Sequence, residues 1–145
     1  MTAGAGERNI MNVTISRNDE IERDEVLAIY GANGWSAAGK PTRLMSALRN
    51  SHSLVTARDG NRLVGIGNAI SDGHLVVYFP HMLVHPDYHG QGVGRKMMAA
   101  MRESYTGFHQ QMLIAERDAV AFYEQMGFER AGDTVPMWIY AGDEH

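Results

Sequence analysis

A glycine-rich stretch in the second half of the chain is the segment with the clearest chemistry. It reads His-Pro-Asp-Tyr-His-Gly-Gln-Gly-Val-Gly-Arg-Lys over residues 85–96, between a predicted strand and a predicted helix. Its three glycines permit positive φ angles and a close approach of the backbone, so several N–H groups can turn toward one anion. The start of the following helix adds its positive dipole end and unpaired N–H groups. This combination is typical of a pyrophosphate-binding loop.

Two common phosphate-binding motifs do not fit this stretch. The dinucleotide fingerprint G-x-G-x-x-G begins with Gly90 and Gly92, but its third glycine is replaced by Arg95. A P-loop needs G-x-x-x-x-G-K-[ST], which the chain lacks. An acidic residue about 20 positions beyond the glycines, Glu116, lies where a nicotinamide or flavin enzyme needs one. The broken glycine pattern argues against that class.

The patterns around the loop predict a mixed α/β sandwich with one central sheet. Helices with one apolar face are predicted over residues 19–30, 41–49, 92–105 and 118–126, with Asp19 as the cap of the first and Gly127 ending the last. Strands are predicted over residues 11–17, 53–59, 62–70, 74–84, 111–115, 128–131 and 136–140. Turns are predicted at Gly60-Asn61 and at Asp72-Gly73.

The strand over 74–84 contains a proline at position 80. Because proline cannot donate to a strand ladder, the strand must bulge or lose its partner at Pro80. A splayed strand leaves backbone groups available to a ligand. The glycine loop follows directly, so both features are expected at one site.

At this point the chain resembles the GCN5-related N-acetyltransferase (GNAT) family. That family has a strand, then V-x-P-x-x-[QR]-G-x-G-[IV]-G opening a helix, then A-x-x-F-Y-x-x-x-G-F. The matching residues here are Val84, Pro86, His89-Gly90-Gln91-Gly92-Val93-Gly94, and Ala119 through Phe128. The resemblance covers nearly the whole chain in strand order and size, and it implies the GNAT fold.

The resemblance also implies acetyl-CoA as cosubstrate. Its pantetheine would pair like an extra strand with the backbone of Met82, Leu83 and Val84, and its pyrophosphate would accept N–H bonds from residues 91–95. The coenzyme-binding residues of the loop are then His89, Gly90, Gln91, Gly92, Val93, Gly94, Arg95 and Lys96. The chain departs from the family pattern at His89, where Gln or Arg is usual, and at Arg117 or Asp118, where an Asn often precedes the last helix.

Three further residues are assigned roles with the help of the resemblance. Tyr123 is expected to be the general acid, since a phenol with a pKa near ~10 suits a thiol with a pKa near ~8.5. His81, beside the proline bulge, is the candidate base. Trp35 lies in the loop that walls the acceptor pocket in the family and is the substrate-side candidate. The other histidines are too scattered for metal spacing, so no metal is predicted.

Length and composition bear on the domain organisation, the partners and the location of the protein. The 145 residues fit a tail over 1–10 and one domain over 11–145. The formal net charge is −4 and there is no Lys/Arg cluster, which argues against a nucleic-acid partner. The chain also lacks a run of 18 or more apolar residues, so no membrane-spanning helix is predicted. There is no cysteine and no secretory signal, so a cytoplasmic protein is expected.

Three functions remain open. The first is acetyl transfer to a primary amine of a small molecule, and the second is acetylation of a protein or peptide. The third is an acyl-CoA-binding sensor without catalysis. A homodimer is a further expectation from the family.

Overall fold

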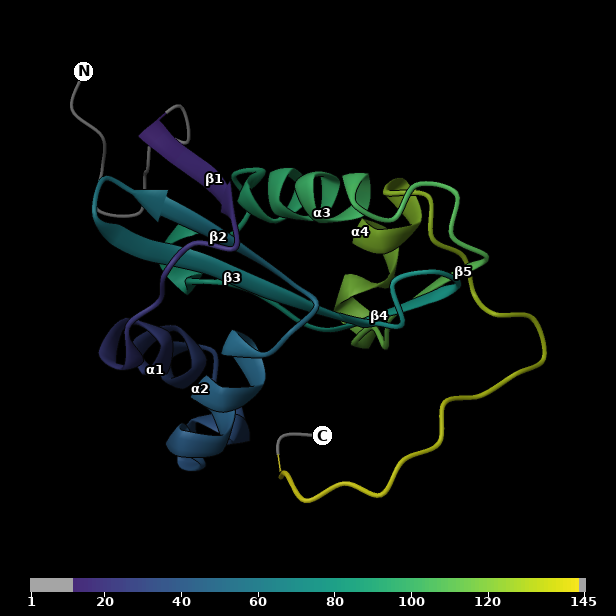
Figure 1. The fold of residues 1–145 in the computed structure, drawn as a ribbon, viewed down its shortest axis with the longest axis horizontal. Helices are drawn as coiled ribbons and strands as arrows, with labels where there is room; N and C mark the ends of the chain where they lie inside the picture. The colour runs from purple at the N-terminus through teal and green to yellow at the C-terminus, as the bar shows by residue number, and fades with distance from the viewer. Residues whose placement is uncertain (1–11, 144–145) are drawn as a thin grey trace.

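Five strands form one sheet in the order β1-β2-β3-β4-β5 in the computed structural model, which describes residues 12–143 (Figure 1). The first four run antiparallel to their neighbours, and β5 runs parallel to β4. The strands are β1 (Val13–Arg17), β2 (Ser53–Asp59), β3 (Arg62–Ser71), β4 (Val76–Val84) and β5 (Gln110–Met112). The mixed α/β architecture expected from the sequence is therefore confirmed.

Helices cover both faces of the sheet. The helices α1 (Arg23–Ala32) and α2 (Pro41–Arg49) lie on one face, and α3 (Val93–Glu103) lies on the other beside α4 (Val120–Gln125) (Figure 1). Alternation along β2 supplies both cores, because Val55 packs on the α3 side and Leu54 on the α1–α2 side. The sheet is thus buried on both faces, with one hydrophobic core above it and one below.

The turns follow the local chemistry of their residues. Gly60 has φ +61° in the short connection between β2 and β3, as the hairpin motif requires. In the next turn the Asp72 carboxylate accepts hydrogen bonds from the backbone N–H groups of His74 and Leu75, at 2.8 and 2.7 Å. Both predicted turns are confirmed.

The expected irregularity in β4 is present. The register of β3 with β4 shifts at Phe79 and Pro80, because Asn68 pairs with His81 while Ile70 pairs with Tyr78. The side chain of Asn68 accepts the His81 backbone N–H at 3.1 Å and thereby satisfies the bulge. On the other edge, β4 pairs with β5 only as far as Tyr78. The two strands then diverge, which leaves the second half of β4 without a strand on that side among residues 12–143.

The start of α1 differs from the prediction. Asp19 is not the cap; its carboxylate instead accepts a hydrogen bond from Arg58 at 3.0 Å. The helix begins after Glu22, whose backbone N–H donates to the Glu25 side chain at 2.9 Å. A capping box at Glu22 and Glu25 therefore competes successfully with the earlier Asp.

The two closing strands predicted over 128–131 and 136–140 were wrong. The structure assigns no strand between Gly127 and Asp143, and every residue over 129–141 is exposed. The apolar and β-branched residues there have strand propensity, but a strand also needs a partner edge. β5 is likewise shorter than predicted. The predicted tail over 1–10 lies outside the described residues.

No helix within residues 12–143 has the length and apolar character needed to span a bilayer.

Candidate active site

The open edge of β4 directs backbone groups away from the sheet at alternate residues. The His85 N–H donates to the Val64 carbonyl at 2.8 Å, so the backbone N–H of His85 points toward β3. Antiparallel ladders alternate, and the register pairs Leu83 with Ile66. Leu83 therefore directs its N–H and C=O toward β3, whereas Met82 and Val84 direct theirs toward the open edge. Of the three residues expected to meet pantetheine, two have the required orientation.

The carbonyl of Val84 already has protein partners. His89 Nε2 lies 2.6 Å from this oxygen, and Asn33 Nδ2 donates to it at 3.2 Å. The imidazole of His89 is thus turned toward the strand, and it ties the glycine loop to the end of β4. Asn33 had no role in the sequence analysis. Its position at the C-cap of α1 was the one signal available for it.

The glycine loop leads directly into α3. Gly90 and Gly92 have φ of +74° and +86°, a left-handed conformation that side chains other than glycine rarely adopt. Gly92 caps the helix, and its carbonyl accepts a hydrogen bond from the Lys96 N–H at 3.1 Å. The preceding N–H groups of the first turn have no acceptor within the helix. They are available to an anion, and the binding of a pyrophosphate there stays a prediction.

Gly94 lies where three elements meet. A Cβ placed on it would be 3.6 Å from the Phe122 ring of α4 and 3.6 Å from the Val84 side chain of β4. The start of α3 therefore packs closely against both α4 and the open edge of β4. Nearby, Arg95 donates to the Gln125 side chain at 2.9 Å, so its charge is directed toward α4. Lys96 is exposed.

Tyr123 lies on the α3 side of the sheet, held between two rings. Its centroid is 5.0 Å from that of Phe122 and 5.8 Å from that of Phe128. Arg102 fixes this end of α4, because its guanidinium donates to the Met126 carbonyl and lies 5.2 Å from the Phe128 ring centroid. Burial raises the pKa of the Tyr123 phenol above its ordinary value. The side chain thus stays protonated over a wider pH range.

His81 lies on the other side of β4, in an aromatic cluster. The Tyr30 hydroxyl is 2.6 Å from His81 Nδ1, and the Trp35 ring centroid is 5.2 Å from the imidazole at an interplanar angle of 86°. Tyr30 and Trp35 also meet edge to face, at 6.0 Å. The structure therefore brings together the candidate base and the candidate substrate-side residue. Sequence reasoning treated Tyr30 as part of the α1 helix and missed this contact.

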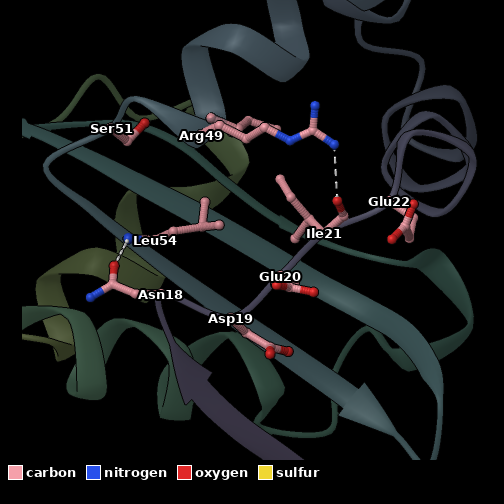
Figure 2. Close-up of a pocket in the computed structure, with 9 residues that line it drawn as sticks. Asn18, Asp19, Glu20, Ile21, Glu22, Arg49, Ser51 and Leu54 are labelled. Carbon is pink, nitrogen blue, oxygen red and sulfur yellow. Dashed lines mark hydrogen bonds between the residues drawn. The ribbon is translucent and has the colours of Figure 1, made fainter.

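Two other features lie apart from this site. His85 is a loop residue, as expected, since its Nδ1 accepts the Asp87 N–H at 3.1 Å. A cavity of about 390 Å³ opens between the β1–α1 connection and the end of α2. Figure 2 shows Arg49 donating to the Ile21 carbonyl across it, and none of the predicted site residues lines it. Within residues 12–143, no group of three His, Asp or Glu side chains is placed to hold a metal ion.

The chain is similar to known acetyltransferases. The Acetyltransferase (GNAT) domain family matches residues 49–130. An uncharacterised N-acetyltransferase of Pyropia yezoensis is 29% identical over 133 residues, which cover 86% of this chain and 74% of that protein. A histone acetyltransferase of Glycine max is 29% identical over 136 residues, which cover 83% of this chain and 57% of the relative. The structure of a GNAT family acetyltransferase from Streptococcus pneumoniae matches with a TM-score of 0.78 and 30% identity, over 89% of this chain and 98% of the other.

Proposed function

The chain belongs to the GNAT family of acetyl-CoA-dependent N-acyltransferases, and on that premise we propose that it transfers an acetyl group directly to a primary amine of a small molecule. The observation that carries the proposal is the open edge of β4 beside the glycine-capped start of α3. The β4 edge offers backbone groups to an extended amide-containing arm, and the start of α3 offers N–H groups to a pyrophosphate. The β4 edge and the start of α3 lie next to each other.

The residues present fit acetyl-CoA. We place pantetheine along the Met82 backbone and the Val84 N–H, since the Val84 carbonyl is held by His89 and Asn33. Leu83 supports the strand through its pairing with β3. The pyrophosphate accepts N–H bonds from residues 91–95, at the start of α3. His89 contributes through the Val84 carbonyl that it contacts, and Lys96 adds exposed positive charge.

The transfer needs one proton removed and one supplied. The amine loses a proton, its nitrogen attacks the thioester carbonyl carbon, and the carbon–sulfur bond breaks. In the proposal Tyr123 gives its phenol proton to the departing sulfur, and His81 takes the proton of the amine. The raised pKa of Tyr123 keeps that proton in place before the reaction. The two side chains lie on opposite sides of β4, so acid and base approach the thioester from different directions.

The Tyr30 contact sets a condition on His81. To accept a proton at Nε2, the neutral ring must carry its hydrogen on Nδ1, facing the Tyr30 oxygen. Tyr30 is fully buried, and burial raises the pKa of its phenol well above the ordinary range, so it keeps its own hydrogen. The acceptor for that hydrogen is His81 Nδ1, 2.6 Å from the phenol oxygen. Losing this acceptor costs about 1–3 kcal/mol, so Tyr30 opposes the base-competent form of His81.

The acceptor pocket is proposed on the α1–α2 side, where Trp35 contacts His81. A flat aromatic wall and an overall charge of −4 suit a small cationic amine. Acetylation of a protein is the second candidate, favoured by the similarity to the relative from Glycine max that is named as a histone acetyltransferase. The cytoplasmic location stays a prediction.

An amine panel separates these functions. The protein is incubated with acetyl-CoA and either small primary amines or lysine-containing peptides, and release of free thiol is followed. We expect turnover with at least one small amine and little with the peptides. Turnover with peptides alone would overturn the small-molecule assignment. Tight acetyl-CoA binding by calorimetry without turnover on either panel would identify a non-catalytic sensor.

A further inference from the structure

Asn68, on β3, carries a polar side chain that is only 4% exposed. A carboxamide at that depth is stable only when its polar atoms have hydrogen-bond partners. Its oxygen accepts the His81 backbone N–H at 3.1 Å, and its nitrogen donates to the Ser51 hydroxyl at 2.9 Å. Asn68 therefore joins the strand that carries the candidate base to the connection that follows α2.

The hydrogens of this chain of bonds can point in one direction only. Because the backbone N–H of His81 is a donor, the carboxamide must turn its oxygen to His81 and its nitrogen to Ser51. The Ser51 hydroxyl accepts from Asn68 and therefore sends its own hydrogen to the Ala47 carbonyl, at 2.8 Å. Ala47 lies in the last turn of α2, where backbone carbonyls lack partners within the helix. The chain of hydrogen bonds thus runs from the β4 bulge to the end of α2, where Ser51 is visible in Figure 2.

The bulge decides which face of the sheet His81 occupies. Phe79 and Pro80 of β4 together oppose Ala69 of β3. Since alternate residues of a strand point to opposite faces, pairing without the extra residue would turn the His81 side chain to the α3 face. In the bulged register the imidazole lies on the α1–α2 face, against Trp35. Contacts that hold this register therefore place the imidazole beside the proposed acceptor pocket.

We propose that Asn68 is a positioning residue of this site, which fixes His81 through its backbone N–H and ties it through Ser51 to α2. The inference rests on the proposed function, in which His81 takes the proton of the amine. Leu48 of α2 and Trp35 belong to the same hydrophobic core. One continuous set of contacts thus holds both the base and the wall of the acceptor pocket. The carboxamide of Asn68 does not titrate, so it acts through His81 and takes no proton itself.

A purely structural role of Asn68 has a different consequence. If the carboxamide only stabilised the bulge, its loss would relax the register of β4 as a whole, including the open edge at Met82 where pantetheine is placed. Acetyl-CoA affinity and turnover would then fall together. A positioning role predicts a lower kcat with acetyl-CoA affinity retained, because Pro80 still prevents regular pairing at the bulge.

Asn68→Ala and Ser51→Ala interrupt the chain of hydrogen bonds at two points, and Asn50→Ala is the matched control. Asn50 donates to the Ser46 carbonyl at 2.8 Å, which is the same kind of bond at the same end of α2 but outside the chain that reaches His81. With a saturating amine, we expect kcat to fall about tenfold or more in Asn68→Ala. The loss should be smaller in Ser51→Ala and absent in Asn50→Ala, with the Kd of acetyl-CoA by calorimetry unchanged in all three variants.

Thermal unfolding verifies that each variant is folded. A wild-type kcat in folded Asn68→Ala would overturn the inference, and so would an equal loss of kcat and acetyl-CoA affinity. Ser51 is only partly buried, so its variant keeps the test decisive if Asn68→Ala does not fold. In that case, a kcat of Ser51→Ala equal to that of Asn50→Ala would refute the inference.

His81→Gln separates a failure of this inference from a failure of the proposed function. If Asn68 acts through His81, Asn68→Ala should cost nothing further in the His81→Gln background, whereas fully additive losses would contradict positioning. Wild-type turnover in His81→Gln alone would remove the base from the proposed function. The NMR signals of the His81 imidazole then still decide the positioning, because they should shift in Asn68→Ala and stay in place in Asn50→Ala. Imidazole signals that do not move in Asn68→Ala would overturn it.

Discussion

The hydroxyl oxygen of Tyr30 lies 2.6 Å from Nδ1 of His81, and this hydrogen bond joins the C-terminal half of α1 to the bulged part of β4. It connects a fully buried phenol with a partly exposed imidazole. The direction of this hydrogen bond is coupled to the tautomer of His81: the hydrogen of the neutral ring is on Nε2 when the phenol donates and on Nδ1 when the phenol accepts. The tautomer in turn decides which reaction the ring can assist.

Replacing Tyr30 with Phe tests the role of His81. If His81 is the base, loss of the phenol frees the base-competent form, and kcat/KM for the amine should stay the same or rise up to about tenfold, equivalent to about 1.4 kcal/mol. The measurement is steady-state kinetics, with thermal unfolding to verify that the variant is folded. A clear fall in kcat in a folded variant would instead assign His81 as an Nε2–H donor to the thioester carbonyl.

Tyr123→Phe tests the acid. The change removes one oxygen from a side chain that is held by ring contacts with Phe122 and Phe128, so the fold should be retained. We expect kcat to fall about 100-fold, within the usual range for a general acid, with little change in acetyl-CoA affinity by calorimetry. Phe122→Leu serves as a neighbour control that keeps the phenol. Unchanged turnover in Tyr123→Phe would remove this residue from the mechanism.

The pH dependence of kcat provides a test without mutation. Burial raises the pKa of Tyr123 above its ordinary value of 10.0, and the acid must be protonated to act. Activity should therefore not decline on the alkaline side until the pH exceeds about 10. The measurement is kcat at saturating substrates from neutral pH upward. A decline centred well below pH 10 that disappears in Tyr123→Phe would contradict a raised pKa.

Gly94→Ala tests the coenzyme site. An added methyl would make ordinary contacts of 3.6 Å with Phe122 and Val84, so the free protein should keep its stability to within about 1 kcal/mol. The same methyl would occupy space between the start of α3 and the β4 edge, where the coenzyme is placed. We expect acetyl-CoA affinity to fall at least about tenfold by calorimetry.

The matched control is Gly31→Ala, also in a helix, where an added Cβ meets nothing within 4 Å. Its coenzyme affinity should equal that of the wild type. Equal affinity in Gly94→Ala as well would place the coenzyme elsewhere.

Much of the fold could be predicted because its determinants are local. The bulge at Pro80 follows from a missing N–H, and the positive φ angles of Gly90 and Gly92 follow from a missing Cβ. The apolar face of α3 appears in the sequence as helical spacing and is buried in the structure. In each case the cause lies within a few residues of its effect.

The acceptor side of the site depends on residues that are distant in sequence. Tyr30 and Trp35 meet His81 only because α1 packs against β4, and no pattern in the chain specifies that pairing. His89 matches the family motif in position, yet its side chain turns to the Val84 carbonyl. Side-chain partners of this kind depend on which helix faces which strand.

The sequence by itself determined the elements, the bulge and the glycine-led helix start, since these arise from the conformational limits of single residues and their neighbours. Only the tertiary structure decided the Tyr30 contact of His81 and the absence of the last two strands from the sheet. Both depend on which parts of the chain meet: the phenol of Tyr30 meets the imidazole, whereas residues 128–131 and 136–140 pair with no described strand. Local propensity cannot supply either partner.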